Sequence, residues 1–382
     1  MGDASTSSVY PAELSVHVLR YPVQHPVRTS FGTMHDRPAV FIRVQDRDGA
    51  HGWGEVWCNF PACGAEHRAR LADTVLRPLL LGRAYDGPAA AWAHLTAATE
   101  VLALQAAEPG PIAQSIAGID LALWDLCARR AGQPLWSYLG GTSDRVAVYA
   151  SGINPDDPGQ VVQQKHGEGY RAFKLKLGFG HERDLRNLRQ ARQILGPGVP
   201  LMADANQGWS PAEAAGMAIA MAELDIAWLE EPLRVDQPLA RWQALARQSP
   251  VPLAAGENYL GADAFHAAID AGFLRVVQPD LAKWGGISGC LPVIRAVRAA
   301  GLRYCPHYLG AGVGLMASAH LLAAVDGMSH GGLLEIDAND NPLRTQLSAP
   351  LLRLENGVAR LGRAPGIGVE PDLDALRAQC AG

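Results

Sequence analysis

The feature of this 382-residue chain that most constrains its fold is a regular alternation after Gly141. Short apolar runs of strand length follow one another, and stretches of helical spacing, such as 182–195, 211–224 and 287–300, lie between them. Repeated strand–helix units predict an α/β fold with a parallel (β/α)8-type barrel of the modified TIM class, and a flat doubly wound sheet is the alternative. The eight runs are RVAVYAS, AFKLKLG, PLMADAN, IAWLEEP, PLAAGEN, LRVVQPD, LRYCPH and GLLEID.

The preceding residues have a different pattern. Three alternating segments, ELSVHVLRY, AVFIRVQD and HGWGEVW, predict strands, and Asp48-Gly49 predicts a hairpin turn between the second and third. Residues 65–131 are rich in Ala, Leu and Arg at helical spacing, and strands followed by helices indicate an α+β domain. We therefore divide the chain into an N-terminal α+β domain, a barrel and a C-terminal segment, at residues 1–135, 136–340 and 341–382.

Polar side chains interrupt the predicted barrel strands at one end only. From Lys174 to Glu335 they recur about every 27 residues, which is the length of one βα unit. Each unit therefore brings its polar group to the C-terminal mouth of the barrel, where barrel enzymes hold their active sites. Capping of the next helix would explain a single polar group more simply. It does not explain why seven consecutive units each place an ionisable group at the same point. The residues are Ser151, Lys174, Lys176, Asp204, Asn206, Glu230, Glu257, Asp280, His307 and Glu335.

Three carboxylates, Asp204, Glu230 and Glu257, end successive strands. Three acids that converge in a poorly solvated mouth repel one another, and a divalent cation removes that cost. Carboxylate oxygens suit Mg²⁺, which also keeps coordination positions for water or substrate. The sequence therefore predicts a single Mg²⁺ site on these three residues.

The lysines are the second unusual feature of the mouth. The chain has 33 Lys and Arg residues, of which only four are lysines, and two of these are Lys174 and Lys176. Residues i and i+2 of a strand share a face, so both side chains are expected to project into the mouth beside the metal. A lysine near a cation and a second lysine loses proton affinity and can act as a base, whereas arginine stays protonated.

His307 and Asp280 end adjacent strands on the other side of the predicted barrel. A neighbouring carboxylate fixes the tautomer of an imidazole and raises its basicity. Lys176 and His307 would then face a bound molecule from opposite sides. Glu335, on the eighth strand, completes the ring and is placed to hydrogen-bond a substrate oxygen.

Composition excludes several classes of protein. The net charge is −5 with acids and bases interspersed, so nucleic acid is not an expected partner. We see no signal peptide and no apolar run of the roughly 20 residues that span a bilayer, so no membrane partner is expected. The six cysteines form no CxxC pair and no zinc spacing, which predicts reduced thiols in a cytoplasmic protein.

Taken together, these motifs resemble the enolase superfamily and, within it, the mandelate racemase subgroup of mandelate racemase/muconate lactonizing enzyme-like proteins. The resemblance covers nearly the whole chain, in GWGEVW, KLK, DANQGW, LEEP, GEN, QPDLAKWGGISG, the His307 strand and LLEID. It implies Mg²⁺ on the three carboxylates, with Lys176 as one acid/base and the His307–Asp280 dyad as the other. It also implies that Lys174 tunes Lys176 and touches the substrate carboxylate, and that Glu335 is the electrophilic partner.

The resemblance further implies that the N-terminal domain caps the barrel and that the C-terminal segment returns to it. Loops 25–37 and 58–64 would then close over the site and select the substrate. Candidate substrate contacts are His25, Arg28 and His35 in the first loop and Asn206 and Ser151 at the mouth. Asp280 replaces a strand-six lysine of the lactonizing and dipeptide-epimerizing relatives, which argues against those reactions, and Lys283 is expected to lie past the strand end.

The implied chemistry is removal of a proton α to a carboxylate through an enediolate held on Mg²⁺. Polar and basic loop residues favour dehydration of a sugar acid, an aldonate or aldarate, to a 2-keto-3-deoxy acid. Racemization or epimerization of a 2-hydroxy acid is the alternative, because both bases are present and Phe31, Trp57 and Phe60 allow an apolar lid. A non-catalytic metal-binding scaffold is the alternative from another class. We expect a small carboxylate as substrate and a homo-oligomer, from dimer to octamer.

Overall fold

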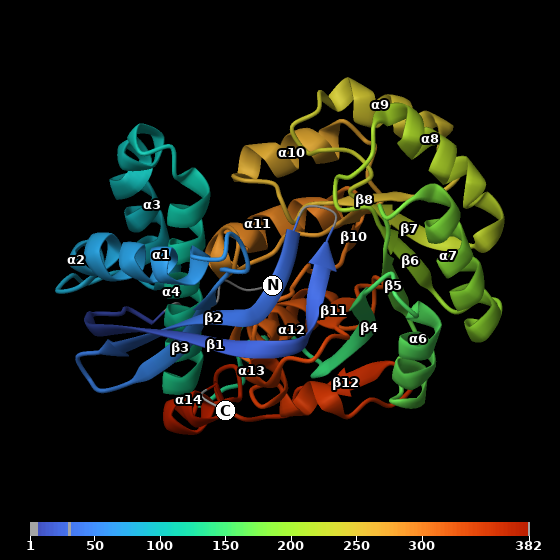
Figure 1. Cartoon of the computed structure of the whole chain (residues 1–382). Helices are drawn as coiled ribbons and strands as arrows, with labels where there is room; N and C mark the ends of the chain where they lie inside the picture. The colour runs from blue at the N-terminus through green and yellow to red at the C-terminus, as the bar shows by residue number, and fades with distance from the viewer. Residues whose placement is uncertain (1–6, 30–31, 381–382) are drawn as a thin grey trace.

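The N-terminal domain is built on a long hairpin. β1 (Pro11–Thr29) and β2 (Gly32–Asp46) pair antiparallel, and β3 (His51–Val56) completes the sheet beyond the turn at Gly49, as the sequence predicts. The computed structural model describes residues 7–29 and 32–380, apart from the side chain of residue 25. Figure 1 shows the hairpin reaching from this domain towards the barrel.

The helices of this domain follow the sheet in the sequence. α4 packs directly against β3, because glycines let the two backbones approach closely. A Cβ atom on Gly54 would lie only 1.9 Å from the carbonyl oxygen of Gly118, which explains the glycines of the GWG motif. The elements are α1 (Gly64–Arg70), a π-helical turn (Leu71–Leu76), α2 (Arg77–Leu80), α3 (Pro88–Gln105), α4 (Pro109–Arg130) and α5 (Leu135–Tyr138).

Each of the eight apolar runs forms a parallel strand. The sheet order is β10-β9-β8-β7-β6-β5-β4-β11, so the last strand of the series pairs with the first, as barrel curvature requires and a doubly wound sheet does not. Within the described residues no ladder joins β10 to β11, and the barrel is a modified one. The strands are β4 (Arg145–Ile153), β5 (Phe173–Lys176), β6 (Leu201–Asp204), β7 (Ile226–Glu230), β8 (Leu253–Ala255), β9 (Val276–Val277), β10 (Arg303–Tyr304) and β11 (Leu334–Asp337).

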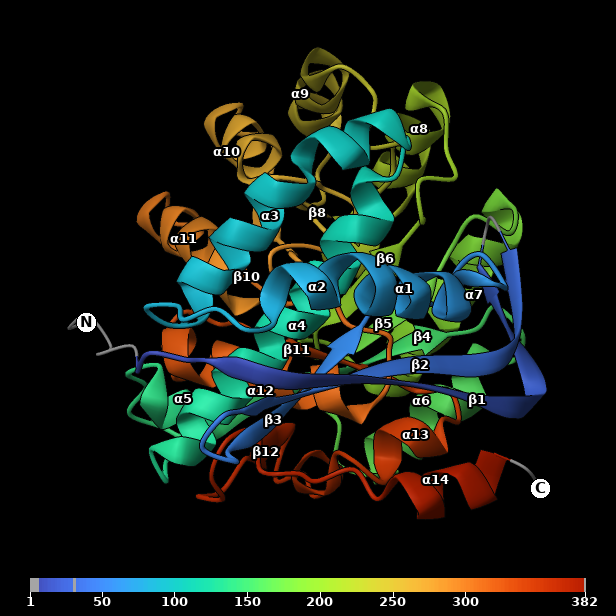
Figure 2. The same ribbon diagram turned by 90° about the vertical axis from the view of Figure 1, so that its left-hand side faces the viewer.

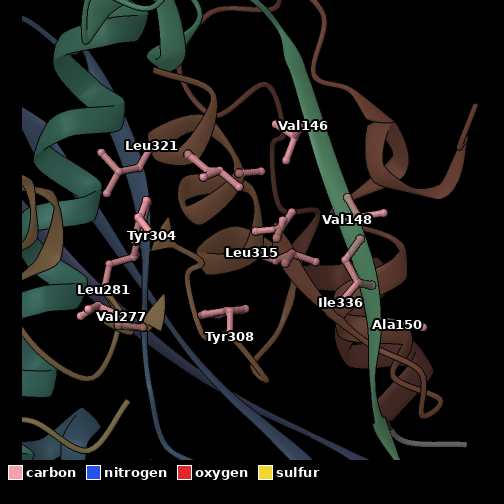
Figure 3. Close-up of a cluster of buried hydrophobic side chains, with 14 of the residues drawn as sticks. Val146, Val148, Ala150, Val277, Leu281, Tyr304, Tyr308, Leu315, Leu321 and Ile336 are labelled. Carbon is pink, nitrogen blue, oxygen red and sulfur yellow. The ribbon is translucent and has the colours of Figure 1, made fainter. Parts of the chain in front are cut away.

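Helices cover the outside of this curved sheet, as Figure 1 shows. Alternate residues of β4, Val146, Val148 and Ala150, face outward and pack with Leu315 and Leu321 of α12 in the cluster of Figure 3. The helices are α6 (Pro158–Gly167), α7 (His181–Leu195), α8 (Pro211–Ala220), α9 (Leu239–Gln248), α10 (Ala262–Asp270), α11 (Gly286–Ala299) and α12 (Gly312–Asp326).

The C-terminal segment contacts both domains. It contains α13 (Pro342–Thr345), β12 (Val358–Arg360), which pairs antiparallel with β4 of the barrel, and α14 (Leu373–Cys380), which packs against β1. Between β12 and α14, Glu370 accepts a hydrogen bond from Trp53 Nε1 at 2.8 Å. Among the described residues no helix has the length and apolarity needed to cross a bilayer.

Buried carboxylates dock the N-terminal domain onto the barrel, in the arrangement that Figure 2 views from the capping side. Glu55 of β3 accepts hydrogen bonds from the backbone N–H groups of Ala311 (2.5 Å) and Gly314 (2.9 Å) at the start of α12. Asp120 of α4 caps α11 in the same way, through the N–H of Ile287 at 2.7 Å. Burial raises the pKa of both Glu55 and Asp120 to about 7.

We predict that Glu55 makes stability depend on pH. Its pKa is about 7 in the folded protein and ordinarily 4.5, so the folded state binds the extra proton and stability falls as the pH rises from about 5 to 8. Glu55→Gln removes the charge and keeps one of the two acceptor oxygens. The melting temperature of the native protein should therefore decrease relative to that of the variant over this range, and a constant difference would contradict the prediction.

Candidate active site

The inward-facing residues of the barrel strands form two layers. The lower layer is apolar, with Tyr149, Ala172, Met202, Trp228, Ala254, Val276 and Cys305 in one buried cluster. On six of these strands the residue two positions further along, which shares the inward face, is polar, and on β8 that position is Gly256. These polar residues are Ser151, Lys174, Asp204, Glu230, Gln278 and His307, and all are buried.

The three carboxylates lie on neighbouring strands above this floor. Asp204 and Glu230 are directly opposite each other in the β6–β7 ladder, and Glu257 follows β8 by two residues. Each carboxylate has a cationic partner. Glu230 accepts from Lys174 Nζ at 2.7 and 2.8 Å, Asp204 accepts from Lys176 Nζ at 2.7 Å, and Glu257 lies 2.9 Å from His307 Nε2. Burial and the neighbouring acids still raise the pKa of Glu230 to about 7.

The donor chemistry of these carboxylates fits Mg²⁺, since they are three buried oxygen donors on adjacent strand ends. In the part of the chain that the structure describes, however, no three His, Cys, Asp or Glu side chains stand together as a ready metal cage. The ion pairs explain this, because the lysines hold Asp204 and Glu230. Asp204 and Glu230 are therefore shared between the lysines and the predicted metal site.

The two lysines are surrounded by acids at the mouth. Burial alone would lower the pKa of Lys176, but Asp204 outweighs it and the pKa is raised. Likewise Glu230 and Glu335 overcome burial and hold the pKa of Lys174 well above its usual value. The lowering predicted from the sequence concerns a lysine beside a bound cation, and it stays a prediction.

His307 forms the expected pair with Asp280. Its Nδ1 lies 2.7 Å from Asp280 Oδ2, which fixes the orientation of the ring. Burial alone would lower the pKa of His307, but Glu257, Glu335 and Asp280 raise it well above 6.5. The ring is thus oriented by Asp280 and surrounded by carboxylates.

The remaining mouth residues support these groups. Glu335 pairs with Lys174 Nζ at 2.7 Å, accepts the N–H of Tyr308 at 3.0 Å and accepts the Ser151 hydroxyl. Ser151 and Glu335 therefore lie beneath the cavity and do not line it. Asn206 does line it, and its Oδ1 accepts from Lys176 Nζ at 2.8 Å.

A cavity of about 230 Å³ lies between the mouth and the capping domain. Lys176 and His307 both line it, from strands at opposite ends of the β10–β5 arc. This volume is small for a ligand pocket, so a compact substrate is indicated. The capping side contributes an apolar wall with a few polar groups, Val27, Thr29, Met34, Arg37, Trp57, Asn59 and Phe60.

The predicted capping-loop contacts differ from this wall. The segment predicted as loop 25–37 largely extends the β1–β2 hairpin, where Val27 pairs with Met34. Strand alternation turns Val27 and Met34 inward, while Arg28 and His35 are exposed and lie outside the cavity. Arg28 instead pairs with Asp156 at 3.4 Å.

The remaining residues of that prediction are not described. The side chain of His25 and the whole of Phe31 lie outside the described residues.

Sequence reasoning missed two cations that line the cavity. Arg37 is buried and pairs with Asp337 at 2.7 Å, joining the capping domain to β11. Lys283, expected past the strand end, reaches back to Glu257 at 3.2 Å. Lysine scarcity, which singled out Lys174 and Lys176, was a signal that applied equally to Lys283.

The curved β/α barrel, the capping domain and the acid–base groups at the mouth define the class of protein. The chain belongs to the mandelate racemase/muconate lactonizing enzyme family of the enolase superfamily. The N-terminal domain of that family matches residues 13–140, and the enolase C-terminal domain-like description matches residues 159–375.

The relatives have several activities. D-galactarolactone cycloisomerase of Agrobacterium fabrum is 31% identical over 94% of this chain and 96% of its own. Arabinonate dehydratase of Saccharolobus solfataricus is 26% identical over 87% and 88%. A mandelate racemase/muconate lactonizing enzyme of Bordetella bronchiseptica has a crystal structure that is 62% identical, with a TM-score of 0.94 over 98% and 100% of the chains. A racemase of Streptomyces coelicolor with bound magnesium is 28% identical, with a TM-score of 0.85 over 97% and 99%.

We predict that Lys174 is required for stability. Lys174→Met leaves Glu230 and Glu335 buried without their ammonium group, which should reduce the free energy of unfolding by about 3–5 kcal/mol. The measurement is urea unfolding at pH 8, where Glu230 of the native protein, whose pKa is about 7, is ionised. Lys165→Met is the matched control, because it removes only the outer pair with Glu168 and should cost within about 1 kcal/mol. Equal losses in the two variants would contradict the prediction.

Proposed function

We propose that this protein is an enzyme that removes the proton α to a carboxylate and eliminates a β-oxygen substituent, with sugar-derived acids or their lactones as substrates. The observation that carries the proposal is the pair formed by Lys176 and His307, which line one small cavity from opposite ends of the strand arc. The dehydratase and cycloisomerase relatives act on substrates of this class by name, which supports the choice. The homo-oligomeric state and the cytoplasmic location stay predictions.

We assign Mg²⁺ to Asp204, Glu230 and Glu257. The support is the buried set of three oxygen donors, together with the racemase relative that binds magnesium. The chemistry that Mg²⁺ supplies when bound is positive charge beside the carboxylate of the substrate.

The residues then divide the proton transfers between them. Lys176 keeps its proton while it is paired with Asp204, so it becomes a base only when Asp204 is engaged elsewhere. It then takes the α-proton. His307, held protonated by Asp280 and Glu257, donates a proton to the leaving oxygen. A hydroxyl then departs as water. The ring oxygen of a lactone leaves the β-carbon as part of a carboxyl group that stays attached to the opened product.

Racemization of a carboxylate is the second candidate. It is favoured by the apolar capping wall, in which Val27, Met34, Trp57 and Phe60 would suit a substrate with an apolar group. In that reaction His307 would return a proton to the opposite face of the α-carbon, and no bond to oxygen would break. A screen of acid sugars, their lactones and 2-hydroxy acids separates the two, because only elimination forms a 2-keto-3-deoxy product.

We predict that Glu230→Gln abolishes activity and weakens Mg²⁺ binding by at least about tenfold, because the amide offers one neutral oxygen in place of a charged carboxylate. Titration calorimetry with MgCl₂ measures the affinity, and circular dichroism checks that the fold is kept. Glu213→Gln, at the exposed start of α8, is the control and should bind Mg²⁺ normally. Unchanged affinity in Glu230→Gln would contradict the metal assignment.

We also predict that the two bases can be separated by hydrogen exchange. For a substrate whose α-proton faces Lys176, His307→Asn should still exchange that proton in D₂O but should not form product, while Lys176→Ala should lose the exchange. Proton NMR on the two variants with the same substrate is the measurement. A substrate that faces His307 would reverse the pattern. Equal exchange in both variants would contradict the assignment of either residue as the base.

A further inference from the structure

Lys283 lies where the capping domain, the barrel and the candidate metal ligands meet. Its Nζ is 3.2 Å from Glu257 Oε2 and 2.7 Å from Asn258 Oδ1. It also lies 4.7 Å from the ring centroid of Trp57, which belongs to the capping domain. Only 12% of the side chain is exposed, although it borders the cavity.

These contacts use the whole bonding capacity of the ammonium group. A lysine has three N–H donors, and here a carboxylate, an amide oxygen and an aromatic face take them. Lys283 is therefore engaged by three neighbouring groups. Its contacts suit a residue that holds other groups in place.

We infer that Lys283 is a positioning residue that orients Glu257 for Mg²⁺, and that Trp57 makes this orientation depend on the docked capping domain. The inference rests on the proposed function in one respect, the role of Glu257 as a metal ligand. Both described contacts of the Glu257 carboxylate, from Lys283 and from His307, end on Oε2. That arrangement leaves Oε1 as the oxygen for a cation.

The barrel side of this arrangement is anchored at both ends. The Lys283 N–H donates to the Asp280 carbonyl at 3.0 Å, which ties the lysine to the residue that orients His307. Asn258, the amide partner of Lys283, donates to both oxygens of the buried Glu231 at 2.9 and 3.0 Å. Lys283 and Asn258 thus approach Glu257 from fixed positions.

The capping side is anchored as well. The backbone N–H of Trp57 donates to the carbonyl of Ala282 at 3.3 Å, and Ala282 is next to Lys283 in the sequence. The Arg68 guanidinium lies 5.7 Å from the Trp57 ring centroid, on a side chain that is itself buried in the capping domain. The aromatic ring is therefore fixed against Lys283 by contacts in both domains.

The test uses Mg²⁺ alone, titrated into the full-length protein by calorimetry. Lys283→Met should weaken Mg²⁺ binding by about tenfold or more, the range for residues that orient metal ligands. Lys283→Arg keeps the charge and the stacking on Trp57, so it should recover most of the affinity. Lys165→Met, far from the site, is the control and should bind as the native protein does.

The clearest contrary outcome is tighter Mg²⁺ binding after Lys283 is removed. If Lys283 only neutralises Glu257, it competes with the cation, and its removal should tighten Mg²⁺ binding. Tighter or unchanged binding in Lys283→Met would overturn the inference, and so would a failure of the native protein to bind Mg²⁺.

The role of Trp57 is tested by a double-mutant cycle. Trp57→Leu should weaken Mg²⁺ binding in the native background, while Trp57→Phe, which keeps an aromatic face, should weaken it less. Because Trp57 acts through Lys283, Trp57→Leu should cost nothing further when Lys283 is already Met. Additive losses would show that the capping domain does not act through Lys283, and would overturn that part of the inference.

Activity measurements separate this inference from the proposed function. With any carboxylate that is turned over, Lys283→Met should raise the Mg²⁺ concentration required for half-maximal rate and recover kcat when Mg²⁺ is saturating. A kcat that stays low at saturating Mg²⁺ would overturn a purely positioning role. If the protein binds Mg²⁺ as predicted but turns over no sugar acid, lactone or hydroxy acid, the proposed function fails while the calorimetric result on Lys283 stands.

Discussion

The structure depends on the pairing of buried charges at the mouth of the barrel. Burying an ion costs several kcal/mol unless a partner of opposite charge stands beside it, and here the carboxylates, lysines and His307 neutralise one another on adjacent strands. The barrel arrangement makes this possible, because the strands bring buried polar residues together at the mouth. The same pairing raises the pKa of Lys176. Asp204 is therefore shared between the proposed metal site and the proposed base.

The second dependence is the fixed position of the capping domain. Glu55 and Asp120 satisfy the N-termini of α12 and α11, and the Arg37–Asp337 pair joins β2 to β11 beside the cavity. Each of these is a buried polar group that the other domain must satisfy, so separation of the domains would leave unpaired groups on both sides. The capping wall of the cavity is thereby held at a set distance from the bases. The position of this wall therefore depends on how the two domains dock as much as on the residues that line the cavity.

Much of this architecture is visible in the sequence because its strands, helices and polar residues recur at a regular interval. Strand–helix alternation gives the barrel, and the recurrence of polar residues such as Asp204 and Glu230 gives the level of the site. The capping contacts were not predictable in this way. Whether Arg28 or Val27 faces the cavity depends on the hairpin continuing through a predicted loop, which only pairing across the sheet decides. The raised pKa of Lys176 in its ion pair with Asp204 was not visible in the sequence either, because it depends on the balance of all nearby charges and not on one neighbour.

We propose that cation binding and the proton on Lys176 are linked through Asp204, which pairs with Lys176 and is assigned to the metal. Calorimetry of Mg²⁺ binding at pH 8 to 9, in two buffers with different heats of ionisation, measures this linkage directly, because the difference in heat gives the number of protons released. We expect a net release of protons from the native protein and a smaller release from Lys176→Met. Equal heats in the two buffers, or equal release from the two proteins, would contradict it.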